Sequence, residues 1–207
     1  MALDATALAS LEEVKDYLRI QGDTRDAQIE KTINRVSARM EQYLTFPVKQ
    51  RQVTDVRTCA RESQILRAYA APIAVAQPVT IAIEGLATQT VWRTEADGPT
   101  TGFDVILASD IDDPLWRPNL FYRRGGWDVG GDHPSPITLT YVGGFSPVPA
   151  DLLEAFFLIV QKYDMEQSKG LQELVTVNTP SGGVTLFDRP IPFRALQILN
   201  EWRGFRV

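Results

Sequence analysis

The sequence predicts an α+β fold with a helical core of three longer helices, a β-rich insertion and a C-terminal hairpin plus a short last helix. Apolar residues recur at helical spacing in residues 10–47 and 150–168, and such a helix buries one face. Between these segments β-branched residues become frequent and Gly and Pro interrupt them, which is typical of strands joined by turns. We expect a single domain, 1–207, made of a helical hairpin (1–47), the β-rich insertion (48–145), the core helix (146–170) and a C-terminal hairpin with its helix (171–207).

The first helix begins at Ser10. Glu13 follows three residues later, and this spacing is a capping box, in which each side chain bonds the backbone amide of the other residue. Gly22 is expected to end the helix, because glycine readily adopts the left-handed conformation found at helix ends. The apolar stripe between them consists of Leu11, Val14 and Leu18.

A longer second helix is expected from about residue 24 to Phe46, where Pro47 ends it because the residue before a proline is kept out of the helical conformation. Its apolar residues repeat at alternating spacings of four and three, which produces one narrow seam that must meet a partner surface. The seam consists of Ile29, Ile33, Val36, Met40 and Tyr43.

Seven strands are predicted in the β-rich insertion. The segments 79–83 and 137–141 alternate between apolar and polar residues, so each is expected to bury one face. The expected strands are 52–57, 64–69, 79–84, 88–94, 103–107, 120–123 and 137–142.

The core helix is expected over residues 150–168, and apolar stripes on two sides indicate that more than one neighbour packs on it. Residues 171–186 are expected to form a hairpin with a turn at 180–183, and a last helix follows at 193–203. The two stripes of the core helix are Leu152, Phe156, Ile159, Val160 and Tyr163, and Leu153 and Phe157. The apolar set of the last helix is Leu196, Leu199 and Trp202, with Phe193 one turn back.

Composition limits the function. The chain has 207 residues and a formal net charge of -5, which argues against a general nucleic-acid binder, because such a protein needs a basic face. Cys59 is the only cysteine, so a disulfide within the chain is excluded and a thiolate metal site is not expected. The first ten residues lack the features of a signal peptide and no 18-residue apolar run occurs, so we expect a cytoplasmic product without a membrane span.

The residues favour no catalytic mechanism. His133 is the only histidine, so a Ser-His-Asp or Cys-His mechanism would have to use it, yet it lies in a loop rich in Gly and Pro. No nucleophile elbow or phosphate-binding loop is present. We therefore assign no catalytic, cofactor-binding or metal-binding residues and expect that the protein is not an enzyme.

Two aromatic and basic segments are candidates for contacts with a partner. Trp116, Arg123, Arg124 and Trp127 combine arginines with rings on which bases or sugars stack, although an ordinary strand with an exposed arginine pair explains them too and better suits the acidic composition. The second segment is near the C-terminus and resembles a docking segment, because Trp and Arg are common interface anchors. Its residues are Trp202, Arg203, Phe205 and Arg206, and a helix packed on its own domain is an equal alternative.

Three motifs, in this order, resemble the head–tail connector family of tailed phages, also called adaptor or head-completion proteins. The first is LEEVKDYLRI, followed by a short Asp-rich break and a long helix that ends in an aromatic residue and proline, at residues 11–47. The second is T-Y-x-x-G-[FY] at residues 140–145, followed by V-P and then D-L-x-x-A at residues 151–155. The third is the turn at 181–183 with a last helix that ends in W-R.

The resemblance implies a structural virion protein and not a catalyst. It implies a homo-oligomeric ring, dodecameric in this family, under the portal protein at the virion neck, assembled in the host cytoplasm. Such a ring extends the channel through which double-stranded DNA passes without sequence-specific binding, and it is a platform for a stopper or tail-completion protein. The family's C-terminal segment reaches towards the portal, which by position is residues 190–207. The segment 84–136 is longer than in compact family members, so their contacts are not carried over to it.

Two alternatives remain. Another neck component, a stopper or tail terminator, is less favoured because those proteins centre on a β-barrel and this chain has a long core helix. A sugar- or single-stranded-DNA-binding module would use the Trp/Arg-rich strand and loop.

A closed ring also needs two different side faces that meet head to tail. Charged faces of the first two helices could supply them, with Arg25, Lys31, Arg35 and Arg39 on one side and Glu12, Glu13 and Asp16 on the other.

Overall fold

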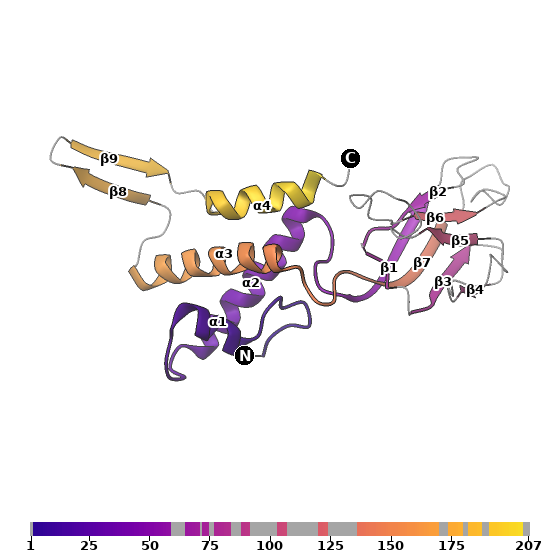
Figure 1. Ribbon diagram of the computed structural model, residues 1–207, viewed down its shortest axis with the longest axis horizontal. Coiled ribbons are helices and arrows are strands. Elements are labelled where there is room, and N and C mark those ends of the chain that lie inside the picture. Colours follow the sequence, from indigo (N-terminus) through magenta and orange to yellow (C-terminus); the bar gives the residue numbers. More distant parts are fainter. Residues whose placement is uncertain are drawn as a thin grey trace. The chain divides into compact units, whose positions relative to one another are not determined.

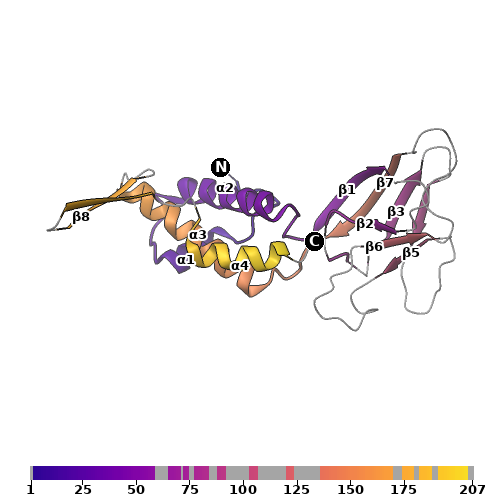
Figure 2. The same ribbon diagram turned by 90° about the horizontal axis from the view of Figure 1, so that it is seen from above.

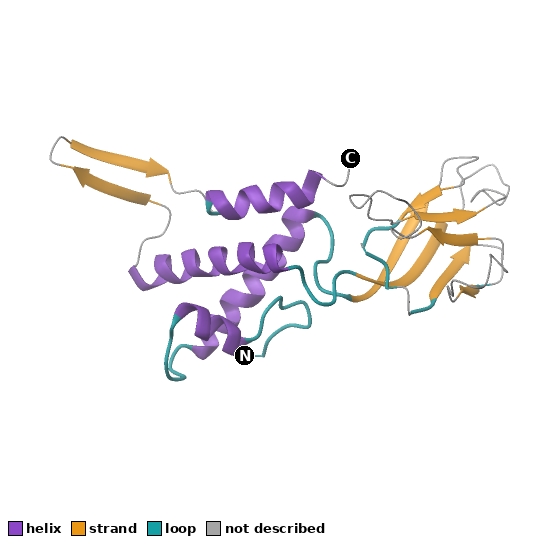
Figure 3. Cartoon of the chain, in the orientation of Figure 1, coloured by secondary structure: helices purple, strands orange, loops and turns teal. Residues whose placement is uncertain are grey.

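The structure is a computed structural model, and its contacts divide the chain into two compact units. Met1–Thr45 and Val148–Val207 form the helical unit, and Phe46–Pro147 form the sheet unit. Figure 3 shows helices and strands in the chain, and the predicted α+β class is confirmed. The single adaptor domain with its four segments stays a prediction. The residues that the structure describes are 2–58, 65–70, 72–74, 77–83, 88–91, 103–106, 120–123, 136–169, 174–179, 182–187 and 191–204.

Four helices make up most of the described part of the helical unit (Figure 1): α1 (Leu11–Leu18), α2 (Asp26–Leu44), α3 (Ala150–Lys169) and α4 (Phe193–Gly204). α3 contacts all three of the others. Phe156 and Val160 of its first apolar stripe are buried. Phe157 of the second stripe stacks on Tyr17 of α1, with the ring centroids 4.7 Å apart. α3 is therefore the core helix of this unit, as its two stripes predicted.

α1 begins as predicted but ends earlier. Glu13 Oε2 accepts the Ser10 amide at 2.7 Å, and Ser10 Oγ accepts the Glu13 amide at 3.2 Å, which completes the capping box. At the other end Arg19 adopts the left-handed conformation with φ 57°, and the Ile20 amide donates to the Lys15 carbonyl at 2.9 Å. The expectation that Gly22 ends the helix is wrong, because Arg19 already caps the last carbonyls.

The connection between α1 and α2 is fixed by Lys15. Its ammonium group donates to Asp26 at 2.8 Å and to Asp23 at 3.0 Å. These two hydrogen bonds, of which the one to Asp26 has the larger effect, raise the pKa of Lys15 above its usual value. The loop is thereby held to the side of α1.

The seam of α2 is buried as predicted, apart from its last member. Ile29, Ile33, Val36 and Met40 are buried, whereas Tyr43 is only half-buried and Leu44 takes its place in the core. Burying each such aliphatic side chain stabilises the fold by roughly 1.5–3 kcal/mol. The segment before α1 also packs on α2, since the Leu8 amide donates to Ser37 Oγ at 3.1 Å.

The sheet unit contains the predicted strands, although β2 and β4 are shorter than expected. The described strands of this unit form two antiparallel sheets with the strand orders β1-β7-β3-β4 and β2-β6-β5. β7 lies between β1 and β3 (Figure 2), so that Tyr141 faces Val53 on one side and Leu139 faces Ile81 on the other. The strands are β1 (Arg51–Thr58), β2 (Ile65–Arg67), β3 (Val79–Ile83), β4 (Gln89–Val91), β5 (Phe103–Ile106), β6 (Leu120–Arg123) and β7 (Pro136–Gly143).

Two glycines at the end of β7 allow three backbone segments to meet. The Phe145 amide donates to the Val48 carbonyl at 2.8 Å, and the Gly144 amide donates to the Pro72 carbonyl at 3.0 Å. A Cβ atom on Gly143 would lie 2.6 Å from the Ala70 Cβ. Gly144 has a φ of +107°, and a Cβ there would lie 2.7 Å from the backbone oxygen of Lys49. Only glycine fits both positions, and the close approach and positive φ at Gly144 are the physical reason for the glycine of the T-Y-x-x-G-[FY] motif.

The tyrosine of the same motif is buried and hydrogen-bonded. Tyr141 is 1% exposed, and its hydroxyl oxygen accepts the buried Ala70 amide at 2.8 Å. Burial raises the pKa of Tyr141 to about 12, because the phenolate form would lose its hydration. Tyr141 is therefore a neutral phenol in the folded protein at neutral pH.

The C-terminal strands pair as predicted. β8 (Leu174–Thr179) and β9 (Gly182–Phe187) form an antiparallel hairpin in which Leu174 faces Phe187 and Val177 faces Val184. The predicted turn at 180–183 was too long, since Gly182 and Gly183 belong to β9 and face Thr179 and Asn178.

Replacing Gly144 by Ala should destabilise the protein by roughly 2–5 kcal/mol, because the new methyl group meets backbone atoms at an unfavourable φ. Gly22→Ala is the matched control: its φ is +79° but nothing lies within 4 Å of the added Cβ, so about 1 kcal/mol of backbone strain is expected. Urea unfolding of both variants measures the difference. Equal losses would show that the close approach at Gly144 is absent.

Tyr141→Phe should cost roughly 1–3 kcal/mol at neutral pH, because the buried Ala70 amide loses its acceptor. The folded-state pKa is raised above the unfolded value, so the stabilisation by the neutral phenol is complete below about pH 10 and is lost as the pH rises through about 12. Between neutral pH and about pH 11, the free energy of unfolding measured in urea should fall less in the variant than in the wild type. Identical pH dependence would contradict the burial of this hydroxyl.

Candidate docking surface

The C-terminal end of α4 is attached to the beginning of α3. Trp202 Nε1 donates to Asp151 Oδ2 at 2.6 Å, and Asp151 Oδ1 accepts the Leu152 amide at 2.9 Å. The carboxylate of Asp151 also complements the positive end of the α3 helix dipole. Trp202 is only 7% exposed, so its indole packs within the helical unit. Its part in docking stays a prediction.

Arg203, the next residue, remains on the surface. Its guanidinium lies over the ring of Tyr43, 5.2 Å from the centroid, and the Tyr43 hydroxyl donates to Asn200 Oδ1 at 2.6 Å. A cation above an aromatic face is attracted by the electrons of the ring. α2 thus orients a charged side chain at the exposed end of α4.

The first turn of α4 presents an exposed aromatic residue. Phe193 is 63% exposed, whereas α4 buries Ala195, Leu199 and Trp202. The prediction that Phe193 shares the apolar face is therefore wrong, because the 4-3 spacing of the buried residues begins at Ala195. Beside it, Arg194 forms an ion pair with Glu154 of α3 at 2.5 Å.

Of the eight candidate residues from the sequence, the structure describes the side chains of Trp202 and Arg203. Phe205 and Arg206 lie outside the described residues, as do Trp116, Arg124 and Trp127. Arg123 is the last residue of β6, and its backbone pairs with Phe103 of β5. Cys59 and His133 also lie outside the described residues.

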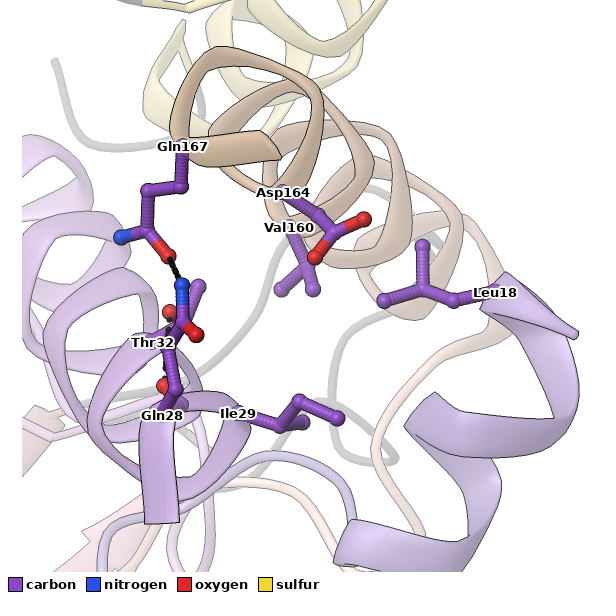
Figure 4. Close-up of a pocket in the computed structure, with 7 residues that line it drawn as sticks. All are labelled: Leu18, Gln28, Ile29, Thr32, Val160, Asp164 and Gln167. Atoms are coloured by element: carbon purple, nitrogen blue, oxygen red, sulfur yellow. Dashed lines mark hydrogen bonds between the residues drawn. The ribbon is translucent and has the colours of Figure 1, made fainter. Parts of the chain in front are cut away.

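A shallow pocket between α1, α2 and α3 is a gap in the packing without enclosed room for a water molecule (Figure 4). Leu18, Ile29 and Val160 line it, one from each helix, and Gln28 Nε2 donates to Gln167 Oε1 at 2.6 Å across its edge. Among the described residues no group of three or more His, Cys, Asp or Glu is placed to hold a metal ion. None of the described helices combines the length and the apolar character needed to span a membrane.

Comparison with known proteins links this architecture to virion necks. Residues 7–97 match the model of the head completion protein family. This is the family that the sequence motifs resemble, and the first of the three motifs, at residues 11–47, lies inside the matched range. No curated protein matches the chain in sequence.

The fold of this chain is similar to that of chains in solved particle structures. It is similar to a chain in the neck of an empty gene transfer agent (GTA) particle computed with C6 symmetry, with 16% identity and a TM-score of 0.63 over 100% of this chain and 95% of that chain. It is similar to a chain in the native GTA virion, with 19% identity and a TM-score of 0.61 over 100% and 94%. It is also similar to a chain in the native GTA neck computed with C12 symmetry, with 18% identity and a TM-score of 0.59 over 100% and 94%.

Sequence reasoning did not find that two of the head completion motifs contact each other. Asp151 opens the D-L-x-x-A motif and Trp202 begins the W-R motif, and the hydrogen bond joins them across 51 positions in the chain. An acidic residue in the first turn of a helix has a local explanation in the helix dipole, so no signal in the sequence indicated a second role for Asp151.

Trp202→Phe should keep the buried ring but remove the N–H donor, at a cost of about 1 kcal/mol, because the exposed Asp151 carboxylate can bond water instead. Trp202→Ala should cost roughly 3–5 kcal/mol, since it also removes buried apolar surface. Urea unfolding measures both. A Trp202→Ala variant as stable as the wild type would place the indole outside the core.

Proposed function

We propose that this protein is a structural subunit of the virion neck, the head–tail interface of a phage-like particle. Identical copies form a ring under the portal protein, extend the DNA channel and offer a platform to a stopper or tail-completion protein. The similarity in fold to neck chains carries this proposal, because it extends over 100% of this chain and 94–95% of two neck chains. A local resemblance would cover one unit, whereas this one covers both.

The family and the charge of the chain support the same function. Head completion is a structural task, which favours a protein that is not an enzyme. The net charge of -5 suits a channel wall, because each basic contact to a phosphate would hold the DNA and hinder its passage.

The exposed C-terminal end of α4 is the proposed contact to the portal. Arg203 is presented there by the Tyr43 ring, and the sequence continues with Phe205 and Arg206. The hydrogen bond from Trp202 to Asp151 holds the C-terminal end of α4 against α3 and so fixes the position of this surface. Truncating Arg203, whose side chain is exposed, should therefore weaken docking without removing a buried side chain.

Quantitative mass spectrometry of purified particles from the source tests the function directly. A copy number equal to that of the portal protein is expected for a ring under the portal. Absence from intact particles would overturn the neck function and would favour the Trp/Arg-rich strand and loop as a binding surface for sugar or single-stranded DNA.

The docking surface is tested by Arg203→Ala combined with Arg206→Ala, supplied in place of the wild-type protein. We expect at least about a tenfold loss of copies per particle, as for removal of interface anchors worth more than 1.4 kcal/mol. Arg194→Ala, at the other end of α4, is the control and should leave the copy number unchanged. Loss in the control alone would place the portal contact at the first turn of α4.

A further inference from the structure

The acidic residues of α1 differ in whether they already have partners. Glu13 is engaged in the capping box with Ser10. Glu12 and Asp16 are exposed, and no side-chain partner is found for either in the described part of the chain. They are four residues apart, so they lie on one face of α1 about 6 Å apart along its axis.

The basic residues of α2 divide in the same way. Arg25 pairs with Asp164, and Arg39 donates to the Tyr163 hydroxyl at 2.5 Å. Lys31 and Arg35 are exposed, and neither has a carboxylate partner among the described residues. Arg35 is positioned over the Tyr163 ring, 5.2 Å from its centroid.

The two remaining pairs match in charge and spacing. Lys31 and Arg35 are also four residues apart, about 6 Å along α2. Two like charges at this spacing repel each other in an isolated helix. The repulsion within each pair is relieved when the acidic pair and the basic pair face each other.

The pairs occupy exposed positions of the helical unit. Leu18 of α1 and Ile29 of α2 both line the pocket between α1, α2 and α3 (Figure 4). At about 100° per residue, Glu12, Asp16 and Lys31 each lie more than a quarter turn around their helices from these lining residues. Arg35 extends over the Tyr163 ring of α3 and stays exposed, so the basic pair lies on the side of α2 that borders α3.

We propose that the acidic pair Glu12 and Asp16 of one copy docks on the basic pair Lys31 and Arg35 of the next copy, as a head-to-tail contact of the ring. The proposal rests on the proposed ring. Two different complementary surfaces on each subunit are what a closed heterologous ring requires. DNA is the weaker occupant, since two basic side chains on an acidic protein give few phosphate contacts and leave Glu12 and Asp16 without a partner.

Variants in which the charges of one pair or of both pairs are reversed test this contact. Glu12→Lys with Asp16→Lys reverses the acidic surface, and Lys31→Glu with Arg35→Glu reverses the basic surface. Each double variant, supplied in place of the wild type, should enter particles at least about tenfold less, because like charges then face each other between copies. The quadruple variant restores opposite charges and should return towards the wild-type copy number.

Gln52→Lys, at an exposed position of β1 outside both proposed contact surfaces, is the control for a change of surface charge, and it should enter particles normally. Circular dichroism and urea unfolding show whether each variant is folded, and the single substitutions Glu12→Lys and Lys31→Glu replace any double variant that is not. Normal entry of both folded double variants, or failure of a folded quadruple variant, overturns this contact. Normal entry of the basic reversal with loss of packaged DNA overturns it in favour of a DNA contact. None of these results changes the copy number of the wild-type protein, which tests the ring itself.

Discussion

The helical unit depends on the burial of α3 against three other helices. A helix that is apolar on two sides cannot be satisfied by one neighbour, and here α1, α2 and α4 each cover part of it. Phe156 and Val160 are almost fully removed from solvent. The polar contacts of the unit follow from this arrangement, because Asp151, Tyr163 and Asp164 of α3 bond Trp202, Arg39 and Arg25.

Local patterns in the sequence predicted the elements because each pattern reflects a local physical cause. Helical spacing predicted α2 and α3, the Ser10–Glu13 spacing predicted a cap, and alternation predicted β3 and β7. The predictions were wrong where two neighbouring residues could each end a helix or each fill the core. Arg19 adopts the left-handed conformation three residues before the expected Gly22, and Leu44 replaces Tyr43 in the core because the tyrosine hydroxyl reaches Asn200.

The contacts between distant residues could not be predicted in this way. The bond from Trp202 to Asp151 and the bond from the Ala70 amide to Tyr141 join residues far apart in the chain. Nor does a sequence show which charges are already paired. Arg25 and Arg39 look as free as Lys31 and Arg35, and only their contacts separate the two groups. The resemblance to the head completion family, in contrast, could be read from the sequence, because the motifs that carry it include Gly144 and the first residues of α3.

The helical unit is interrupted in sequence by the whole sheet unit. α1 and α2 leave the ribosome first, but α3, which covers their apolar seam, follows only after about a hundred further residues. At about 5–20 residues per second, synthesis of this stretch takes roughly 5–20 s. During that time Ile29, Ile33 and Met40 have no final partner, whereas the sheet unit is synthesised without interruption and is able to fold first. The sheet unit can therefore fold before the helical unit, although α1 and α2 are made before any of its strands.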